Sequence, residues 1–233
     1  MRHRFFTPLP LDGVIDLAGE ERHHAARVVR LHAGEEVELF DGTGSAAIAV
    51  VEEVSRDRVR VRVTGRAPAR EPAAAFTLAM AVIQLDRFEF VLQKATELGA
   101  ASIVPLVTDR VEVRPERYRG KRERWERIVF EAVKQSGRAK IPLLEEPATF
   151  DRIVAGGEPK ILFDADQEPS PAPASLGRCT LLVGPEGGWS GREVDLARAA
   201  GCAFARLGPR RLRAETAAVA ALATIAAKYG DLV

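Results

Sequence analysis

The amino-acid sequence predicts an α/β protein of two domains: a small β-rich unit at residues 1–70 and a larger α/β domain at residues 73–233. Three observations carry this prediction. Valine and arginine alternate strictly in one early segment, strand-like segments alternate with amphipathic helices later, and the Pro/Ala-rich stretch "APAREPAAA" (67–75) separates the two patterns. With 233 residues, 46% hydrophobic and 29% charged, the chain has the composition of an ordinary globular protein.

The first 70 residues are predicted to form one short helix and several strands. The helix is expected at "GEERHHAARVVRL" (19–31). The segment "EVELFDGTGSAAIAVVEEV" (36–54) places two apolar runs around Asp41-Gly42-Thr43-Gly44, which is typical of a hairpin. In "DRVRVRVTG" (57–65) the valines face one side and the arginines the other. We therefore expect a half-buried strand with a row of guanidinium groups, Arg58, Arg60 and Arg62, on its outer face.

The second domain alternates strands with helices, which predicts a parallel sheet covered on both faces. Two pairs, Asp86 with Glu89 and Ser190 with Glu193, have the spacing of capping boxes at helix starts. Strands are predicted at 76–83, 102–107, 160–165, 179–184 and 203–208, and helices at 86–99, 122–138, 190–201 and 214–230.

Charge and cysteine usage narrow the class of protein. The net charge is only +1, but residues 56–70 and 109–140 each carry an excess of five positive charges. Basic clusters of this kind suit a phosphate backbone, although for either cluster alone a solvated, arginine-rich face is the favoured interpretation. Cys179 and Cys202 lie in apolar surroundings without metal-ligand spacing, which indicates core thiols in a reducing compartment. No apolar run reaches the ~20 residues that cross a bilayer, so a cytoplasmic protein without a bound metal or membrane partner is expected.

Three loops that follow strands are the candidate ligand site, because ligands of open α/β sheets bind beyond the carboxyl ends of strands. The loops are "LFDADQ" (162–167), "VGPEGGWS" (183–190) and "LGPRRLRAET" (207–216). No standard nucleotide-binding fingerprint and no covalent-nucleophile motif is present. One Gly-Pro turn is usually only a turn, but two of them on strands of one sheet favour a ligand site.

The segments "LLVGPEGGWSGREVDLA" and "RLGPRRLRAETAAVAAL" resemble the two signature segments of the SPOUT RNA methyltransferases. The branch that methylates N3 of a uridine in 16S ribosomal RNA is the most similar. The segments "RFEFVLQKATELGA", "VPLVTDR", "RWERIVFEAVKQSGRAKIP", "HHAARVVRLHAGEEVELFDG" and "YGDL" extend this resemblance over nearly the whole chain. One departure is "QLDRFEF", which stands where the family usually has a Lys-Gly-like element.

The resemblance implies a SPOUT domain with a mainly parallel sheet and a trefoil knot, preceded by a small PUA-like β-barrel that binds RNA. It also implies S-adenosyl-L-methionine as the cofactor, 16S rRNA or the small ribosomal subunit as the partner, and a homodimer. The residues agree with a flat ligand on these loops, since glycines let a ligand approach the backbone and leucine and valine side chains can wall it. The expected cofactor contacts are Leu162, Phe163, Val183, Gly184, Pro185, Glu186, Gly187, Gly188, Leu207, Gly208, Leu212, Arg213, Glu215 and Thr216.

The chemistry expected of such an enzyme assigns roles to a few charged residues. Uracil N3 is a poor nucleophile until it loses its proton, so the site must stabilise a uracilate or accept that proton. We expect Arg213 to stabilise the anion and Glu186 to act as base or orienting group. A carboxylate near a sulfonium also favours the positive charge of the cofactor, so the alternative role of Glu186 is cofactor binding alone. The expected RNA contacts are Arg4, Arg27, Arg30, Arg110 and Arg138.

Two other functions fit parts of the pattern. One is a SPOUT ribose 2′-O-methyltransferase, against which the N-terminal barrel and the ending "ETAAVAAL" argue. The other is a ribosome-assembly factor without activity, which binds RNA through the barrel. Cofactor binding separates that factor from an enzyme, because it has no need of an intact Gly184-Pro185-Glu186-Gly187 loop.

Overall fold

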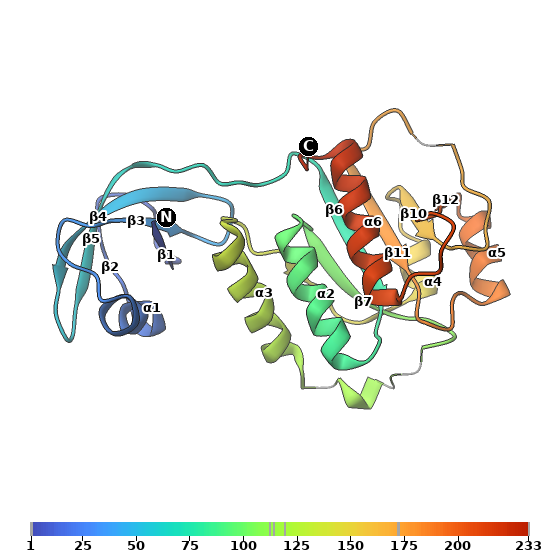
Figure 1. Ribbon diagram of the computed structural model, residues 1–233, viewed down its shortest axis with the longest axis horizontal. Coiled ribbons are helices and arrows are strands. Elements are labelled where there is room, and N and C mark those ends of the chain that lie inside the picture. The colour runs from blue at the N-terminus through green and yellow to red at the C-terminus, as the bar shows by residue number, and fades with distance from the viewer. Residues whose placement is uncertain (1, 112, 114, 119, 172, 233) are drawn as a thin grey trace. The chain divides into compact units, whose positions relative to one another are not determined.

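The computed structural model describes residues 2–111, 113, 115–118, 120–171 and 173–232 (Figure 1). The chain forms two compact units. The first consists of Met1–Glu71 together with Val133–Ile141, and the second of Pro72–Ala132 and Pro142–Val233. The segment Val133–Ile141 is thus part of the first unit although it lies far along the chain, which no sequence pattern indicated.

The first unit is built on a five-stranded mixed sheet with the strand order β1-β3-β4-β5-β2. β1 runs parallel to β3, and the remaining neighbours are antiparallel. The predicted hairpin is confirmed as β3 and β4. The strands are β1 (His3–Phe6), β2 (Val14–Asp16), β3 (Glu36–Phe40), β4 (Ala46–Val54) and β5 (Val59–Arg66).

The predicted helix of this unit differs in form from the expectation. α1 (Gly19–His23) continues directly into a π-helix, η1 (His24–Val29), which ends at Arg30 in the left-handed conformation, with φ of 60°. The outer face of β5 also differs from an open row of guanidinium groups. Arg58 and Arg60 both pair with Asp16, and Arg62 pairs with Glu52. Most of the positive charge of this strand is therefore neutralised within the unit.

The second unit is an α/β fold whose strand pairings are all parallel, as predicted. The strand order is β12-β10-β11-β6-β7-β8, and β9 pairs with β7. The strands are β6 (Ala75–Ala81), β7 (Ser102–Val107), β8 (Leu143–Leu144), β9 (Ala148–Thr149), β10 (Lys160–Phe163), β11 (Arg178–Val183) and β12 (Ala203–Ala205). The helices are α2 (Leu85–Glu97), the 3₁₀ turn η2 (Pro115–Arg117), α3 (Arg122–Ser136), α4 (Phe150–Val154), α5 (Gly191–Ala199) and α6 (Ala214–Tyr229). The end of α3, from Val133, belongs to the first unit.

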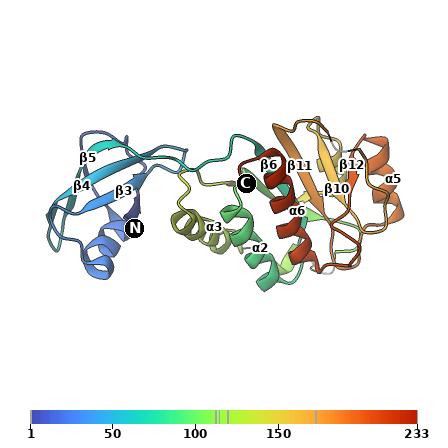
Figure 2. The same cartoon turned by 45° about the horizontal axis from the view of Figure 1, so that its top comes forward.

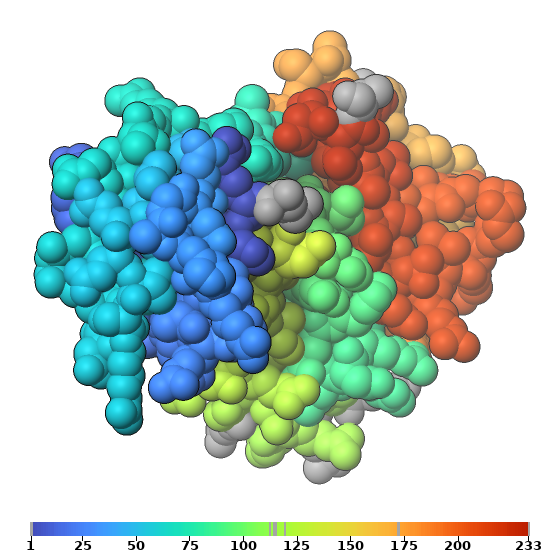
Figure 3. Space-filling model, turned by 60° about the vertical axis from the view of Figure 1, so that its left-hand side comes forward, coloured from blue at the N-terminus to red at the C-terminus, as the bar shows by residue number. Residues whose placement is uncertain are grey.

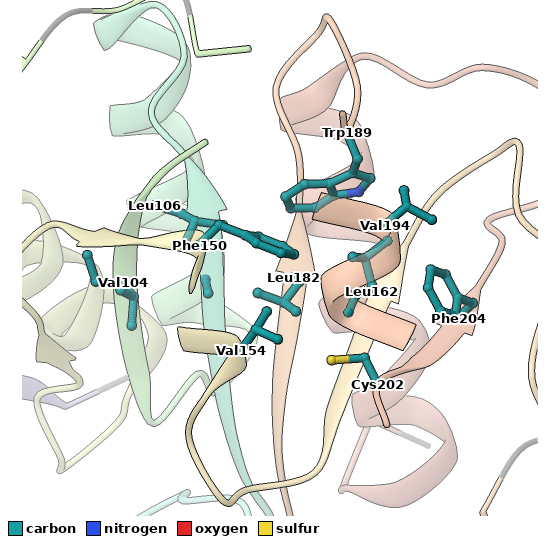
Figure 4. Packing of buried hydrophobic residues seen from close by; sticks show 13 residues of the cluster. Val104, Leu106, Phe150, Val154, Leu162, Leu182, Trp189, Val194, Cys202 and Phe204 are labelled. Carbon is teal, nitrogen blue, oxygen red and sulfur yellow. The ribbon is translucent and has the colours of Figure 1, made fainter. Parts of the chain in front are cut away.

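Helices cover both faces of this sheet. α6 lies along β6 and β11 with α2 beside it (Figure 2). Part of α6 also reaches the surface of the molecule (red in Figure 3). On the opposite face, Phe150 and Val154 of α4 and Val194 of α5 pack on Leu162 and Leu182 of the strands (Figure 4).

Two predicted helix starts have different outcomes. The capping box of Ser190 and Glu193 is present at the start of α5, with both reciprocal hydrogen bonds. The capping box expected for Asp86 and Glu89 is wrong, because α2 begins one residue earlier and Gln84 occupies the N-cap position without a side-chain cap. Glu89 instead accepts hydrogen bonds from Arg124.

The strand order brings the three candidate loops together. β11 lies between β10 and β6, whereas β12 follows on the far side of β10. The chain then returns from β12 to α6, which packs against β11 and β6. Since all these strands are parallel, the loops after β10, β11 and β12 meet at one edge of the sheet. The trefoil knot itself stays a prediction.

Candidate functional site

A cavity of about 150 Å³ lies at the carboxyl ends of β10, β11 and β12. It is lined by nine of the residues that were predicted to contact the cofactor: Phe163, Val183, Gly184, Pro185, Glu186, Gly188, Leu207, Gly208 and Leu212. The structure adds lining residues that the prediction missed: Asp164, Ala165, Asp166, Trp189, Arg210, Arg211, Ala214 and Ala217. All but Ala217 lie within the three loops, and Ala217 directly follows the third, so only the choice of individual residues was missed.

Five predicted contacts are absent from the lining. Leu162 is wholly buried in the core under α4 and α5, on the face of the sheet away from α6. Gly187 turns towards Arg110, whose guanidinium donates to the Gly187 carbonyl at 2.9 Å. Arg213, Glu215 and Thr216 surround the start of α6, but of this helix only Ala214 and Ala217 reach the cavity.

Trp189 forms the support under the glycine-rich loop. Its indole Nε1 donates to the Phe163 carbonyl oxygen at 3.0 Å, and its ring packs against Phe150 with centroids 5.1 Å apart (Figure 4). A Cβ atom on Gly184 would stand only 3.0 Å from Trp189 Cε2. Any larger residue at 184 would therefore crowd this buried tryptophan, which joins the loop after β11 to the end of β10.

The loop itself is a tight turn with Glu186 at its tip. The Gly188 N–H donates to the Pro185 carbonyl oxygen at 2.9 Å, and Gly188 has φ of +70°, which favours glycine. The Glu186 side chain lies at the cavity wall and is 44% exposed. It makes a close ion pair with Arg87, which comes from the first turn of α2.

Arg87 also lies near a second carboxylate. Its Nε is 4.0 Å from Oε1 of Glu215, in the first turn of α6. The other oxygen, Glu215 Oε2, is buried and has no hydrogen-bond partner among the described residues. One guanidinium therefore serves two carboxylates, and the three side chains together carry a net charge of −1.

A buried carboxylate holds the far end of the loop. Glu193 is 0% exposed, and its two oxygens accept the backbone N–H groups of Asp109 at 2.9 Å and Ser190 at 2.8 Å. The Ser190 hydroxyl in turn donates to Asp109 Oδ2 at 2.6 Å. The loop after β11 is thus fastened to the loop after β7, although β6 lies between these two strands.

Arg192 completes this fastening from the first turn of α5. It donates to both carboxylate oxygens of Asp109 and pairs with Asp151 of α4. The hydrogen bonds from Arg192 and from Ser190 lower the pKa of Asp109 to about 2, so Asp109 is ionised at neutral pH.

Arg213 is the N-cap residue of α6, and no side chain caps this helix start. Its side chain is exposed and makes no hydrogen bond or ion pair with any described residue. The uncapped N–H groups and the free guanidinium give the start of α6 two kinds of donor for an anion.

The predicted RNA-contacting arginines separate into two groups. Arg4 and Arg138 have structural contacts within the first unit, which does not favour them as RNA contacts. Arg4 pairs with Glu38 and donates to the carbonyls of residues 133, 134 and 138, and Arg138, 4% exposed, pairs with Glu71. A guanidinium that is buried against a carboxylate has few donors left for a phosphate. Arg27, Arg30 and Arg110 are exposed.

Two further properties bear on the type of site. Among residues 2–111, 113, 115–118, 120–171 and 173–232, no cluster of three or more His, Cys, Asp or Glu side chains could hold a metal ion. Within the same residues, no helix is long and apolar enough to span a membrane. Cys179 and Cys202 are buried and unpaired, and burial raises the pKa of Cys179 to about 12.

Comparisons with known proteins agree with this architecture. Residues 70–226 match the model of an RNA methyltransferase domain, and residues 17–64 match that of an RNA methyltransferase PUA domain. The chain is 34% identical to the ribosomal RNA small subunit methyltransferase E of Synechocystis sp., with 92% of this chain and 73% of the relative covered. It is also 34% identical to that of Mycobacterium tuberculosis, with 95% and 89% covered.

A solved structure gives the same result for the fold. The ribosomal RNA small subunit methyltransferase E of Neisseria gonorrhoeae, crystallised with S-adenosyl methionine, superposes with a TM-score of 0.89 at 30% identity, and both chains are covered completely. The two family models together span most of the chain and follow its two units in order. The chain therefore belongs to the RNA methyltransferase family of the ribosomal RNA small subunit methyltransferase E type.

Proposed function

We propose that this protein transfers a methyl group from S-adenosylmethionine to N3 of one uridine in 16S ribosomal RNA. The observation that carries the proposal is the cavity at the ends of β10, β11 and β12, whose glycine-rich wall is backed by Trp189. A relative of the same fold was crystallised with this cofactor.

The lining of the cavity fits S-adenosylmethionine. Gly184, Gly188 and Gly208 line the cavity without side chains, so the backbone there is accessible to a flat group such as adenine. Leu207 and Leu212 offer apolar walls, and the first turn of α6 offers free N–H groups. Glu186 at the cavity wall suits a cationic ligand, and so does the partly buried Glu215, which lies close to Arg87. When bound, the cofactor supplies an electrophilic methyl group on a positively charged sulfur.

The residues of the chain then have separate tasks. We assign to Arg213 the stabilisation of negative charge on a uracil oxygen as the N3 proton leaves, because its guanidinium has no partner among the described residues. To Glu186 we assign an orienting and charge-balancing role, since one of its oxygens is already engaged by Arg87. Gly187, Glu215 and Thr216 lie beside the cavity wall. We assign to them an indirect effect on the cofactor, through the backbone they contribute next to the wall and through the charge of Glu215.

For RNA binding we propose the exposed arginines Arg27 and Arg30 of the first unit and Arg110 of the second. Exposed guanidinium groups can contact phosphates, and Arg110 has further donors besides the Nη1 that binds the Gly187 carbonyl. Because N3 lies on the Watson–Crick edge, the target base must be unpaired or flipped out before the transfer. We further propose a cytoplasmic homodimer acting on 16S rRNA or the small subunit, supported by the family resemblance and by the small residues on the exposed part of α6.

Mass spectrometry of nucleosides from 16S rRNA tests the proposal in cells. Deletion of the gene should remove 3-methyluridine from the rRNA, and the wild-type gene should restore it. The Arg213→Ala gene, expressed at the same level, should not restore it. A normal 3-methyluridine content in the deletion strain would contradict the proposal.

A further inference from the structure

We infer that Arg87, Glu186 and Glu215 form a charge triad that makes the site prefer the cationic methyl donor over its neutral demethylated product. The inference rests on the proposed function, because it concerns the cofactor of that same cavity. It assigns to Arg87 a specificity-determining role that the sequence patterns did not indicate.

The composition of the triad is the first step. Arg87 pairs closely with Glu186 and lies 4.0 Å from Glu215, so two carboxylates share one guanidinium. Glu215 is only 14% exposed, and its Oε2 is buried without a hydrogen-bond partner among the described residues. The negative charge of Glu215 is therefore incompletely compensated by the protein.

The position of the triad is the second step. Its members come from three segments that meet at the same sheet edge: the first turn of α2, the turn after β11, and the first turn of α6. Glu186 lines the cavity directly, and Glu215 lies between two lining residues, Ala214 and Ala217. The surplus charge of −1 is thus placed at the wall of the proposed cofactor site, where the charges of the other ionisable lining residues, Asp164, Asp166, Arg210 and Arg211, sum to zero.

The third step is the chemistry of the two ligands. S-adenosylmethionine and S-adenosylhomocysteine differ only by the methyl group and by the positive charge on sulfur. Contacts to adenine, ribose and the amino acid are shared, so they cancel in the ratio of the two affinities. A negative wall favours the sulfonium alone, and loss of the methyl group removes that attraction, which promotes exchange of product for fresh donor.

The expected effects follow from the sign of each change. Arg87→Met leaves the triad with a charge of −2 and should raise the ratio of the product Kd to the donor Kd. Glu186→Gln removes the surplus charge and should lower that ratio. Because Arg87 and Glu186 are partly exposed, solvent screens them, and we expect changes of about three- to tenfold.

Two variants serve as controls. Arg87→Lys keeps the charge while it changes the hydrogen-bond geometry, so the ratio should stay near that of the wild type. Lys94→Met removes the same charge from the same helix two turns further on, where Lys94 pairs with Glu97, and should also leave the ratio unchanged. A purely structural role of Arg87 would weaken both ligands together and leave the ratio as it was.

Isothermal titration calorimetry of the full-length protein with each ligand measures both Kd values. Opposite shifts for Arg87→Met and Glu186→Gln, with both controls unchanged, are the expected result. Ratios that stay within twofold of the wild type in both variants would overturn the inference while the proposed function stands. Failure of the wild-type protein to bind either ligand would instead contradict the proposed function. If Arg87→Met does not fold, Glu186→Gln decides alone, because a ratio that does not fall refutes the triad.

Discussion

Glu193→Gln tests whether the buried carboxylate holds the cofactor loop in place. Glutamine has nearly the shape of glutamate, so packing around this wholly buried side chain is preserved. Its carbonyl oxygen can replace one acceptor, but its NH₂ group must face the second backbone donor, either Asp109 N–H or Ser190 N–H. An orphaned buried donor costs roughly 1–3 kcal/mol, and the relief from burying a charge offsets part of it. We therefore expect a loss of about 2 kcal/mol in the free energy of unfolding.

Urea unfolding followed by tryptophan fluorescence measures this loss, since both tryptophans, Trp125 and Trp189, belong to the second unit. Calorimetry should also show weaker cofactor binding, because the same two hydrogen bonds fasten the turn that carries Glu186. The matched control is Glu131→Gln, which makes the same chemical change at an exposed position of α3. Loss of less than about 0.5 kcal/mol in Glu193→Gln, or an equal loss in the control, would refute the reasoning.

Four other outcomes are expected. Arg213→Ala should reduce kcat by at least about tenfold with little change in cofactor Kd, and an equal loss in both would contradict its anion-stabilising role. Gly184→Ala should cost about 1–3 kcal/mol of stability in thermal or urea unfolding, because its Cβ would press on Trp189, whose ring also packs against Phe150. An unchanged stability would show that the ring can move. Asp109 has a lowered pKa of about 2, so its contribution to stability should be complete above about pH 4 and lost as the pH falls towards 2. A difference in the free energy of unfolding between wild type and Asp109→Asn that stays constant over this range would contradict this prediction. Arg30→Gln should weaken RNA binding in a filter or fluorescence assay and reduce its salt dependence, without changing the thermal unfolding midpoint.

Local patterns were enough to predict the class of fold. Alternation of valines located β5, and apolar runs located β6, β7, β10 and β11, because burial of a strand leaves a direct trace in the sequence. The Ser190 capping box was predictable for a similar reason, since both partners lie within one helical turn. The capping box predicted for Asp86 and Glu89 is not formed, because Glu89 binds Arg124 instead, and the spacing of two residues in the sequence does not show such a partner.

Contacts between distant segments could not be predicted in this way. Arg4 pairs with Glu38 at a separation of 34 residues, and Arg138 with Glu71 at 67, so neither showed its buried partner in the sequence. Their arginines were taken as RNA contacts for that reason. Arg87 was likewise missed, because its importance depends on Glu186, 99 residues later.

The residues of the cavity were predicted in part. Gly-Pro turns after consecutive strands identified the loops, and nine of the predicted residues line the cavity. Which side chains face the cavity depends on the order of the strands in the sheet, and the apolar periodicity of the sequence does not reveal that order. Leu162 shows the limit, because it is the last but one residue of β10 at the site yet packs into the opposite face of the sheet.

The most direct test of the central claim is a methyl-transfer assay with labelled S-adenosylmethionine and small ribosomal subunits from cells that lack this protein, followed by nucleoside mass spectrometry. The account predicts that the label is recovered in 3-methyluridine and that Arg213→Ala abolishes most of it. Label in a 2′-O-methyl nucleoside would contradict the proposed reaction and indicate a ribose methyltransferase. Absence of both transfer and cofactor binding would contradict the account as a whole and favour an RNA-binding assembly factor.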